Sequence, residues 1–584
     1  MIRGPSRPSL HTLWLLATLL LLGGCASLPS LDGRSESTAV ASVPGSPLHE
    51  ALQPGLTAHP GLSGFYSLPD GEDAFAARIV MIDAAVRSLD AQYYIWRADV
   101  TGRLMFDALR RAAARGVQVR LLLDDNNTQG LDPLLAALAA QPNIEIRLFN
   151  PFRHRRWRPL GFLTDFARLN RRMHNKSLTV DGAATLVGGR NIGNEYFDAG
   201  DSLGFIDLDV VAVGPIVAEV ARSFDEYWRS DSAYPVDRLL PPPLPAQLEA
   251  VARLGEELDS LPEAQRYLER VRGTRVMRDV MAGELSFEWA TAQLVVDDPA
   301  KGLGRARRDE LLTSRLEEVF AGPVHSELLL VSPYFVPGRE GTQALAAMTQ
   351  GGATVKVLTN ALESTDVAAV HSGYAKRRRA LLKAGVELWE LRREVGNVRI
   401  GPRGAGRRSA TAAETRAAVP GGESATAPRP AAPQERRSAA GRDRSALPEN
   451  GARNGSESGV LAGNVGGSSR LGSSDASLHA KTFAVDGKRL FIGSFNFDLR
   501  SALHNTELGI VIDSPEWARS LQRTFERRVP EVSYRVQLDA RERLEWMERR
   551  ADGKEQRYDR EPNASAGRKL LVLLLGLLPI EGLL

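Results

Sequence analysis

One short pattern occurs twice in this chain and constrains its fold more than any other feature. Histidine, lysine and Asp-Gly follow one another at the same spacing in MHNKSLTVDG, from Met173, and in LHAKTFAVDG, from Leu478. The histidine and lysine are two residues apart in an apolar run, which predicts a strand with both side chains on one face. The Asp-Gly pair predicts a tight hairpin turn. A pattern His-x-Lys-x4-Asp should arise by chance only about 0.01 times in such a chain, so two copies indicate a duplicated unit.

The segments around the two copies repeat in the same order. SLDAQYYIW, GRLMFDALRRAAARG and VQVRLLLDD predict a strand, a helix and a strand, and SELLLVSPYF, GTQALAAMTQGG and ATVKVLTN repeat this order later in the chain. Such units form parallel strand pairs covered by a helix. After each copy comes another strand and then a helix, as in GFIDLDVVAVGP and IVAEVARSFDEYWRS. We predict an α/β fold of two similar lobes, each a mainly parallel mixed sheet flanked by helices, packed as a pseudo-two-fold bilobed unit.

The composition along the chain suggests where these lobes begin and end. We place the first lobe at residues 61–234, a mostly helical connector at 235–300 and the second lobe at 301–528. Within the second lobe, residues 397–475 are dominated by Gly, Ser, Ala, Pro and Arg and have no apolar period, which predicts a disordered insertion. Residues 529–584 form a C-terminal extension whose apolar tail, KLLVLLLGLLPIEGLL, is shorter than the roughly 20 residues that span a bilayer.

The N-terminus has the pattern of an export signal. Arg3 and Arg7 precede an apolar run, and Leu-Gly-Gly lies directly before Cys25, the only cysteine of the chain. This order is typical of a bacterial lipoprotein signal peptide at residues 1–24 with lipidation of Cys25; a plain cleaved signal peptide or an uncleaved anchor helix is the alternative. Residues 25–60, rich in Ser, Pro and Gly, predict a flexible tether. We expect a membrane-anchored lipoprotein of the bacterial cell envelope whose body faces the periplasm.

The duplicated pattern carries side chains suited to a phosphodiester. Two lysines from facing lobes can hold the equatorial oxygens of a phosphoryl group, and asparagine amides can add donors. Two histidines can divide nucleophilic and acid–base work. An asparagine follows each histidine by 17 residues. The alternative is a purely structural role, in which each segment is a half-buried hairpin with incidental polar residues. The catalytic candidates are His174, Lys176, Asn191, His479, Lys481 and Asn496.

These residues resemble the HKD motifs of the phospholipase D superfamily, His-x-Lys-x4-Asp with a downstream Gly-x-x-Asn, over roughly residues 61–528. The segments YYIW, LNRRMHNK, SPYFVPG and LLGLLPIE further resemble the bacterial cardiolipin synthase branch of the C-type. The resemblance implies a phosphatidyltransferase that passes a phosphatidyl group through a phosphohistidine to phosphatidylglycerol and so makes cardiolipin. A phospholipase D that releases phosphatidic acid is the alternative, followed by a phosphodiesterase or nuclease on the same site. A catalytically inactive lipid-binding scaffold is disfavoured because both His-Lys pairs are complete.

The resemblance also implies individual roles. His174 corresponds to the nucleophile and His479 to the general acid and base, an assignment that could be reversed. The superfamily places a carboxylate from the opposite half behind each histidine. On this basis we expect Glu507 to orient His174 and Asp207 to orient His479.

Positions that differ between the copies, and the turn residues, are interpreted separately. Ser494 stands where the first copy has Gly189, so we expect a hydroxyl contact with the phosphate from the second copy alone. Asp181 and Asp486 open the Asp-Gly turns, where aspartate commonly has a structural role. We therefore predict that both are turn residues rather than catalytic ones.

Two further sets of residues are weaker candidates. His371 and Tyr374 share a face of a predicted helix and could line a pocket for the acceptor; a plain surface helix is the alternative. The basic run Arg153–Arg158 contains Trp157 and could meet anionic lipid headgroups; the alternative is a solvated positive patch.

Partners and cofactors follow from the same observations. The implied substrates are phospholipids, namely phosphatidylglycerol and, as a second donor, phosphatidylethanolamine, presented by a membrane; whether an accessory protein takes part is left open. The net charge of +3 argues against a dedicated nucleic-acid binder. No HExxH, EF-hand or P-loop pattern occurs, so we predict no metal and no cofactor.

Overall fold

The computed structural model describes most of the chain between residues 28 and 584. The described residues fall within one compact unit that spans 1–406 and 461–584. The predicted signal peptide and Cys25 lie outside the described residues, and so does the predicted insertion apart from residues 399–402. The described ranges are 28–42, 44–200, 204–320, 322–393, 399–402, 477–550 and 552–584.

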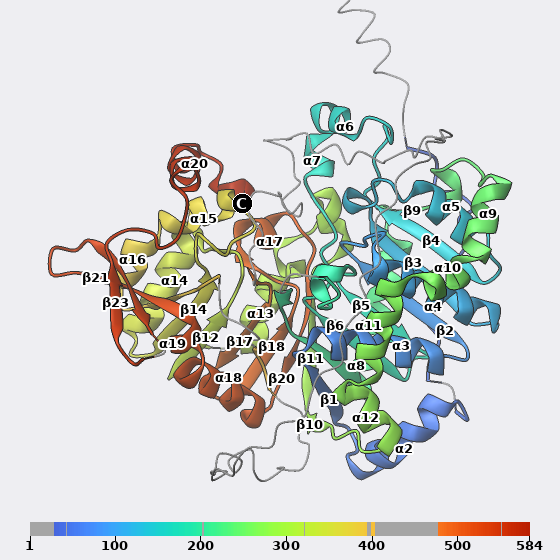
Figure 1. Cartoon of the computed structure of the whole chain (residues 1–584), viewed down its shortest axis with the longest axis horizontal. Coiled ribbons are helices and arrows are strands. Elements are labelled where there is room, and N and C mark those ends of the chain that lie inside the picture. The colour runs from blue at the N-terminus through green and yellow to red at the C-terminus, as the bar shows by residue number, and fades with distance from the viewer. Residues whose placement is uncertain are drawn as a thin grey trace, which may run out of the picture. The chain divides into compact units, whose positions relative to one another are not determined.

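Among the described residues the first half forms a nine-stranded sheet, in the order β10-β1-β8-β6-β5-β2-β3-β4-β9 (Figure 1). The chain pairs in parallel only along β2–β3–β4, and the other neighbours are antiparallel. The strands are β1 (Ser63–Leu68), β2 (Ser88–Tyr93), β3 (Gln118–Asp124), β4 (Ile144–Phe149), β5 (Ser177–Val180), β6 (Ala184–Gly188), β8 (Asp209–Val213), β9 (Ala233–Pro235) and β10 (Glu288–Ala290).

The second half repeats this order in a sheet with ten described strands, β11-β20-β18-β17-β12-β14-β15-β21-β22-β23. Parallel pairing is again confined to three neighbours, β12–β14–β15. The fold is therefore the predicted pair of mixed α/β sheets, but the expectation of mainly parallel sheets was wrong, because most neighbouring strands in both sheets pair antiparallel, in part through hairpins such as β5–β6 and β17–β18. The strands are β11 (Ala292–Val296), β12 (Glu327–Val331), β14 (Thr354–Asn360), β15 (Glu387–Leu391), β17 (Thr482–Val485), β18 (Arg489–Gly493), β20 (Leu508–Ile512), β21 (Ser533–Leu538), β22 (Leu544–Arg549) and β23 (Glu555–Tyr558).

Helices cover both sheets and begin at sequence signals that explain them. The Asp99 side chain accepts the Gly102 N–H at the start of α4, and Ser514 Oγ accepts the Trp517 N–H at the start of α18. The helices of the first half and the connector are α2 (Pro47–Ala58), α3 (Gly71–Ala84), α4 (Val100–Ala114), α5 (Asp132–Ala139), α6 (Arg158–Thr164), α7 (Phe166–Leu169), α8 (Pro215–Arg229), α9 (Pro245–Ala252), α10 (Leu254–Ser260), α11 (Pro262–Arg272) and α12 (Arg275–Ala282). Those of the second half are α13 (Leu312–Phe320), α14 (Gly338–Gln350), α15 (Ala368–Ala375), α16 (Arg378–Lys383), α17 (Leu499–Leu503), α18 (Pro515–Arg527), α19 (Val529–Val532) and α20 (Ala566–Gly576).

A single hydrophobic cluster contains side chains from both halves. It includes Val210 of β8 and Phe224 of α8 from the first half, and Ile510 of β20 and Leu521 of α18 from the second. All four side chains are buried. The two sheets therefore pack through a shared apolar core, which holds the two His-Lys pairs in one structure.

The connector and the C-terminal extension both contribute strands, so the sheets extend past the boundaries expected from composition. Strand β10 pairs with the first sheet, whereas β11, which begins two residues after β10 ends, pairs with the second. The second sheet thus begins before residue 301. Strands β21 to β23 of the extension continue it beyond β15.

The described part of the expected tether is bound to the first half. Arg147 Nη2 donates to Ser35 O at 2.6 Å, and Arg120 Nη1 donates to Ser37 O at 2.9 Å. Because both guanidinium groups are buried, they need acceptors, and the backbone carbonyls of this segment supply them. The segment then leads into α2 rather than continuing as an unstructured linker. No helix in the described part of the chain is both long enough and apolar enough to cross a membrane.

Candidate active site

Each histidine of the duplicated pattern contacts a carboxylate from the opposite half. His174 Nδ1 lies 2.8 Å from Glu507 Oε2, and His479 Nδ1 lies 2.5 Å from Asp207 Oδ2. All four side chains are buried. An ionised carboxylate only accepts, so Nδ1–H donates in each pair and the Nε2 of a neutral ring keeps its lone pair. The structure therefore has two histidine–carboxylate pairs, each built from both halves.

Backbone pairing between the halves places these side chains. His174 N donates to Thr506 O at 2.9 Å, and His479 N donates to Ile206 O at 2.8 Å. The second contact continues the short parallel pairing of β16 (Ser477–Leu478) with β7 (Phe205–Ile206). In both cases the accepting residue directly precedes the carboxylate. The same cross-half register is thus used twice.

Each His-Lys pair lies directly before a strand, β5 or β17, and not within a strand as predicted, and each lysine lies beside its own histidine. Lys176 Nζ donates to His174 O at 2.6 Å, and Lys481 Nζ donates to His479 O. Burial, together with the nearby charge of Lys481, lowers the pKa of Lys176 to about 7, and burial also lowers the pKa of Lys481. Two buried ammonium groups favour an anion between them. Within the described residues, no group of three or more His, Cys, Asp or Glu side chains is placed to hold a metal ion.

Burial and the lysine charges keep both histidine rings neutral near pH 7. Burial and then the charge of Lys481 lower the pKa of His479 to about 3. Burial and the charges of Lys176 and Lys481 lower the pKa of His174 well below its ordinary value. Lys481 lowers the pKa of His174, and Lys176 lowers the pKa of His479. Each lysine therefore lies near the histidine of the other half, and the two motifs face one site. A neutral ring with a free Nε2 can act as a nucleophile or a base.

The two carboxylates have different surroundings. Glu507 accepts hydrogen bonds from Ser494 Oγ at 2.5 Å and Ser501 Oγ at 2.7 Å. The sequence comparison of the two copies suggested that the Ser494 hydroxyl contacts the phosphate. In the structure this hydroxyl instead donates to Glu507. In the first half, a Cβ at Gly189 would lie 2.1 Å from Asp207 Oδ1. Glycine stands there because the shorter aspartate occupies the space that a side chain would fill.

The two asparagines differ in the same way. Asn191 Oδ1 accepts the Ile95 N–H at 3.1 Å, and Asn191 Nδ2 donates to Tyr196 Oη at 3.0 Å. Asn496 is buried, and its Oδ1 has no hydrogen-bond partner among the described residues. Both polar atoms of the Asn191 amide are therefore bonded to neighbouring protein groups, whereas Oδ1 of Asn496 is left without a partner in the described structure.

Asp181 and Asp486 lie at the turns, where they were expected to be structural. Their φ values are 50° and 53°, in the left-handed region that aspartate tolerates before glycine. Asp181 accepts the N–H of Arg87 at 2.8 Å, and Asp486 accepts the N–H of Ser326 at 2.8 Å. Both carboxylates thus bind the chain that enters β2 or β12.

Aromatic rings line the two histidines. The Tyr94 ring lies edge-on to His174 with centroids 5.0 Å apart. Tyr196 and Phe205 contact His479, with centroids 5.2 and 5.0 Å away. These rings restrict the orientation of each imidazole and exclude water from it. Tyr94 comes from the YYIW segment, so its place in the site follows from a stretch that the sequence had singled out.

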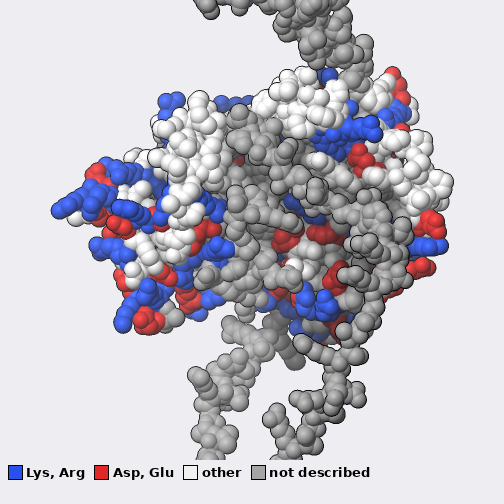
Figure 2. All heavy atoms as spheres, turned by 45° about the horizontal axis from the view of Figure 1, so that its top comes forward, with Lys and Arg blue, Asp and Glu red and all other residues white. Residues whose placement is uncertain are grey.

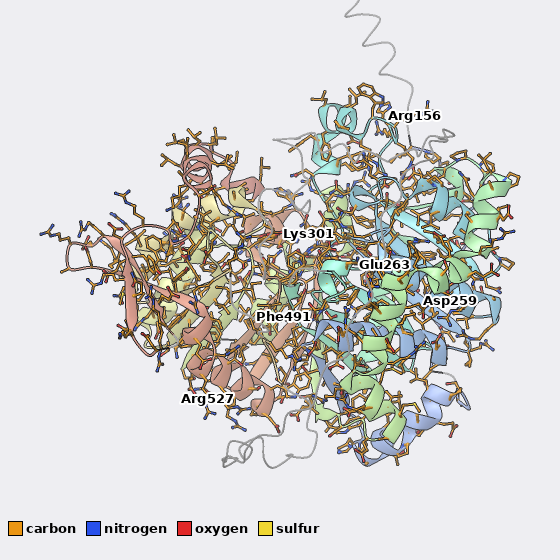
Figure 3. The ribbon with its side chains drawn as sticks, viewed as in Figure 1. Arg156, Asp259, Glu263, Lys301, Phe491 and Arg527 are labelled. Atoms are coloured by element: carbon orange, nitrogen blue, oxygen red, sulfur yellow. The ribbon has the colours of Figure 1, made fainter. Side chains whose placement is uncertain are left out.

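A buried ion pair supports Glu507 and was missed in the sequence. Asp297 Oδ2 accepts the Glu507 N–H at 2.9 Å and pairs with Lys301 Nζ at 2.8 Å. Lys301, labelled in Figure 3, also donates to Ser501 O at 2.9 Å. One feature of the sequence could have pointed to Lys301. Lysine is rare in this chain, and this one lies at the predicted boundary between the connector and the second lobe.

His371 and Tyr374 lie in a separate buried network. Tyr374 Oη donates to Glu390 Oε1 at 3.0 Å, and His371 Nε2 lies 2.5 Å from Arg378 Nη2. Arg378 also pairs with Glu561 of the C-terminal extension. These contacts fasten the extension to α15 and α16. No described contact joins them to the His-Lys residues, so a role in an acceptor pocket stays a prediction.

Comparison with known proteins identifies the family. The family model described as "Cardiolipin synthase, PLD-like domain" matches residues 79–228 and 437–529. Cardiolipin synthase C of Escherichia coli (strain K12) is 41% identical over 537 residues, which cover 92% of this chain and 99% of that protein. The chain belongs to the phospholipase D-like cardiolipin synthase family.

Two further matches are more distant. An uncharacterized protein of Helicobacter pylori (strain ATCC 700392 / 26695) is 27% identical over 80% of this chain and 79% of its own length. Among solved structures, phosphatidylserine synthase of Haemophilus influenzae Rd KW20 matches with a TM-score of 0.46 and 12% identity, over 83% of this chain and 91% of that one.

Proposed function

We propose that this protein is a phosphatidyltransferase that makes cardiolipin from phosphatidylglycerol. The observation that supports the proposal most directly is the pair of cross-half contacts, His174 with Glu507 and His479 with Asp207. Each carboxylate contacts Nδ1 and so leaves Nε2 of its histidine for the reaction, beside two buried lysines, of which Lys481 lies 3.4 Å from His479 Nε2. A two-step transfer of a phosphodiester requires these groups. The name of its relative in Escherichia coli, cardiolipin synthase C, points to the same reaction.

In the first step His174 Nε2 attacks the phosphorus of the donor lipid. The bond from nitrogen to phosphorus forms while the bond from phosphorus to the departing alcohol breaks, and His479 supplies the proton that this alcohol takes. Burial is the main cause of the low pKa of His479, and the charges of Lys481 and Lys176 lower it further; the negative charge of a bound phosphodiester offsets those two charges and so favours the protonated ring that gives up this proton. Glu507 stabilises the positive charge that develops on the phosphorylated His174 ring.

In the second step the acceptor lipid attacks the phosphohistidine. His479, now neutral, removes the proton from the glycerol hydroxyl of phosphatidylglycerol, the new oxygen–phosphorus bond forms, and His174 leaves as a neutral ring. Lys176 and Lys481 hold the equatorial oxygens in both steps. When phosphatidylglycerol is also the donor, the products are cardiolipin and glycerol. Phosphatidylethanolamine as donor would release ethanolamine instead.

We further propose that the protein is anchored by a lipidated Cys25 in the bacterial cell envelope and that the described unit faces the periplasm. The supporting observation is the order of positive, apolar and small residues that ends at the only cysteine. Substrates would then come from the leaflet on that side. The metabolic incorporation of labelled fatty acid into the wild type, and its loss in Cys25→Ser, would test the anchor.

The activity is tested with purified full-length protein in vesicles that contain labelled phosphatidylglycerol, with and without phosphatidylethanolamine. We expect labelled cardiolipin. Phosphatidic acid as the sole product would favour a phospholipase D that uses water. The absence of any lipid product would favour a lipid-binding scaffold and would contradict the proposal.

The order of the two histidines is tested with a donor that carries a p-nitrophenol leaving group. Such a leaving group needs no protonation, so we expect His479→Asn to release about one equivalent of p-nitrophenol and to accumulate a phosphohistidine on His174. His174→Asn should release none. A burst in His174→Asn and not in His479→Asn would reverse the assignment.

A further inference from the structure

Helix α20 presents an apolar surface that nothing in the described structure covers. It has no buried residue, although nine of its eleven residues are Leu, Val, Ala or Gly. Leu573 is 64% exposed and Leu577, directly after the helix, is 77% exposed. Leucine side chains are stabilised by burial away from water, so a cluster of them on a surface indicates an interaction site. The exposed leucines here are Leu570, Leu571, Leu573, Leu574, Leu577 and Leu578.

A second exposed apolar segment comes from the first half, at α6 and α7. Trp157 is 70% exposed and Leu163 is 82% exposed, and Leu160 and Phe166 are exposed as well. Tryptophan and leucine on short helices are typical of segments that lie in the interface of a bilayer. Figure 2 shows uncharged surface over α20 and over α6 on the face that it turns forward.

One arginine joins the two segments. Arg500 N donates to Leu584 O at 2.8 Å, which holds the chain that follows α20. The Arg500 guanidinium donates to Asn170 Oδ1 and Asn170 O, each at 2.9 Å, which holds the end of α7. Leu503, three residues after Arg500 on α17, is also exposed. The two apolar segments are therefore fastened to the same short helix.

Positive charge borders both segments. Arg156, labelled in Figure 3, is exposed next to Trp157 and has no ion-pair partner among the described residues. Arg153 is also exposed. Arg568 and Lys569 lie in the first turn of α20. Arginine and lysine near an apolar face attract anionic lipid headgroups.

We propose that α6–α7 and α20, with Leu503 between them, form one docking surface that sits on an anionic phospholipid bilayer. The charge argues for anionic lipid as the occupant, and so does the position of the site. His174 is only 6% exposed and follows Asn170 by four residues, so a lipid must bring its phosphodiester to the histidine while its acyl chains stay in an apolar phase. This inference rests on the proposed function insofar as it takes phospholipids as the substrates.

The docking surface is tested with a polarity-sensitive fluorophore on single cysteines, in full-length protein that carries Cys25→Ser. Leu163→Cys and Leu573→Cys report on the two segments. Met281→Cys, on α12, is the matched control because Met281 is 82% exposed yet lies outside the surface. With phosphatidylglycerol vesicles we expect a blue shift and a several-fold rise in emission at positions 163 and 573 and no change at 281. Neutral phosphatidylcholine vesicles should have a weaker effect.

Three outcomes would overturn the proposal. A response at only one of the two segments would exclude a single surface, and an equal response at position 281 would show non-specific adsorption. A blue shift that grows with protein concentration without lipid would show that a second copy of the chain covers the surface. None of these readouts depends on turnover, so they remain informative if the protein makes no cardiolipin.

A double variant connects the surface to catalysis. Leu573→Gln with Leu577→Gln should weaken binding to phosphatidylglycerol vesicles by about tenfold or more, because two apolar side chains are lost from the contact. Turnover of a short-chain phosphatidylglycerol that is monomeric in water should stay within about twofold of the wild type. Equal losses on both substrates would mean that α20 supports the fold and not the docking.

Discussion

Glu507 and Asp207 stand behind equivalent histidines, yet they differ in protonation. Burial raises the pKa of Glu507 to about 7, although Lys176 and the hydroxyls of two serines favour its ionised form. Burial also favours protonation of Asp207, but its contact with His479 and the charge of Lys481 hold its pKa below the ordinary value. Near neutral pH, the carboxylate behind His174 titrates and the carboxylate behind His479 does not.

This difference predicts the acidic side of the pH profile. As the pH falls through about 7, Glu507 gains a proton and no longer accepts from His174 as a carboxylate, so the rate should fall. Glu507→Gln should be slower than the wild type and should lack this decline. Asp207→Asn, the matched variant, should be slower and should keep it. The measurement is kcat/KM for phosphatidyl transfer from about pH 5.5 to 8.5. An unchanged decline in Glu507→Gln would assign it to another group.

At the scale of elements, the two hairpins position the His-Lys pairs that directly precede them. Asp181 and Asp486 adopt left-handed conformations, and the glycines that follow them do so as well. Their carboxylates accept backbone N–H groups at the start of β2 and β12, so each turn is tied to the neighbour of the strand that directly follows the histidine and lysine. In the structure, each of the two aspartates thus links its turn to a neighbouring strand.

Replacing these aspartates should affect stability and not chemistry. Asp181→Ala leaves three backbone N–H groups without their acceptor, one of them on buried Ser88, and should lower the free energy of unfolding by about 1–3 kcal/mol; the more exposed Asp486→Ala should lower it less. Asp181→Asn should fall between the wild type and Asp181→Ala, because asparagine tolerates the left-handed conformation. The measurement is urea unfolding followed by tryptophan fluorescence. A tenfold loss of kcat with unchanged stability would instead indicate a catalytic aspartate.

At the scale of the whole molecule, neither half contains a complete site. Each histidine comes from one half and its carboxylate from the other, and the two halves share one apolar core. The strands β15 and β17 of the second sheet are separated in the chain by the Gly-, Ser-, Ala-, Pro- and Arg-rich stretch, so this stretch can change length without changing the sheet.

Shortening that stretch therefore tests the architecture. When residues 403–471 are replaced by a Gly-Ser linker of about 30 residues, we expect kcat/KM to stay within about twofold, because such a linker spans the gap at a similar closure entropy. Cardiolipin formation in vesicles and the urea midpoint are the measurements. A large loss of either would show that the replaced residues contribute to the site or the core.

Much of the fold could be predicted because it is encoded in short segments. The alternation of strand and helix, the apolar runs and the Asp-Gly turns involve neighbours in the chain, and each predicts local structure without knowledge of the rest. The connector was harder to interpret, because β10 and β11 are short strands whose apolar residues pair with different sheets. Resemblance to the family, rather than any local pattern, pointed to Glu507 and Asp207.

The sequence by itself determined the two-lobed fold, the two His-Lys pairs and the structural turns, since these depend on spacing within a few residues. Only the tertiary structure decided that Ser494 faces Glu507, that Lys301 and Asp297 support that carboxylate, and that Arg500 joins α7 to the chain after α20. Those contacts join residues that are far apart in the chain: Asp297 and Glu507 are separated by 210 positions, and Asn170 and Arg500 by 330. Their partners are selected by burial, because a buried polar group needs a hydrogen-bonding partner wherever the fold brings one close, and that proximity is not written in any local pattern.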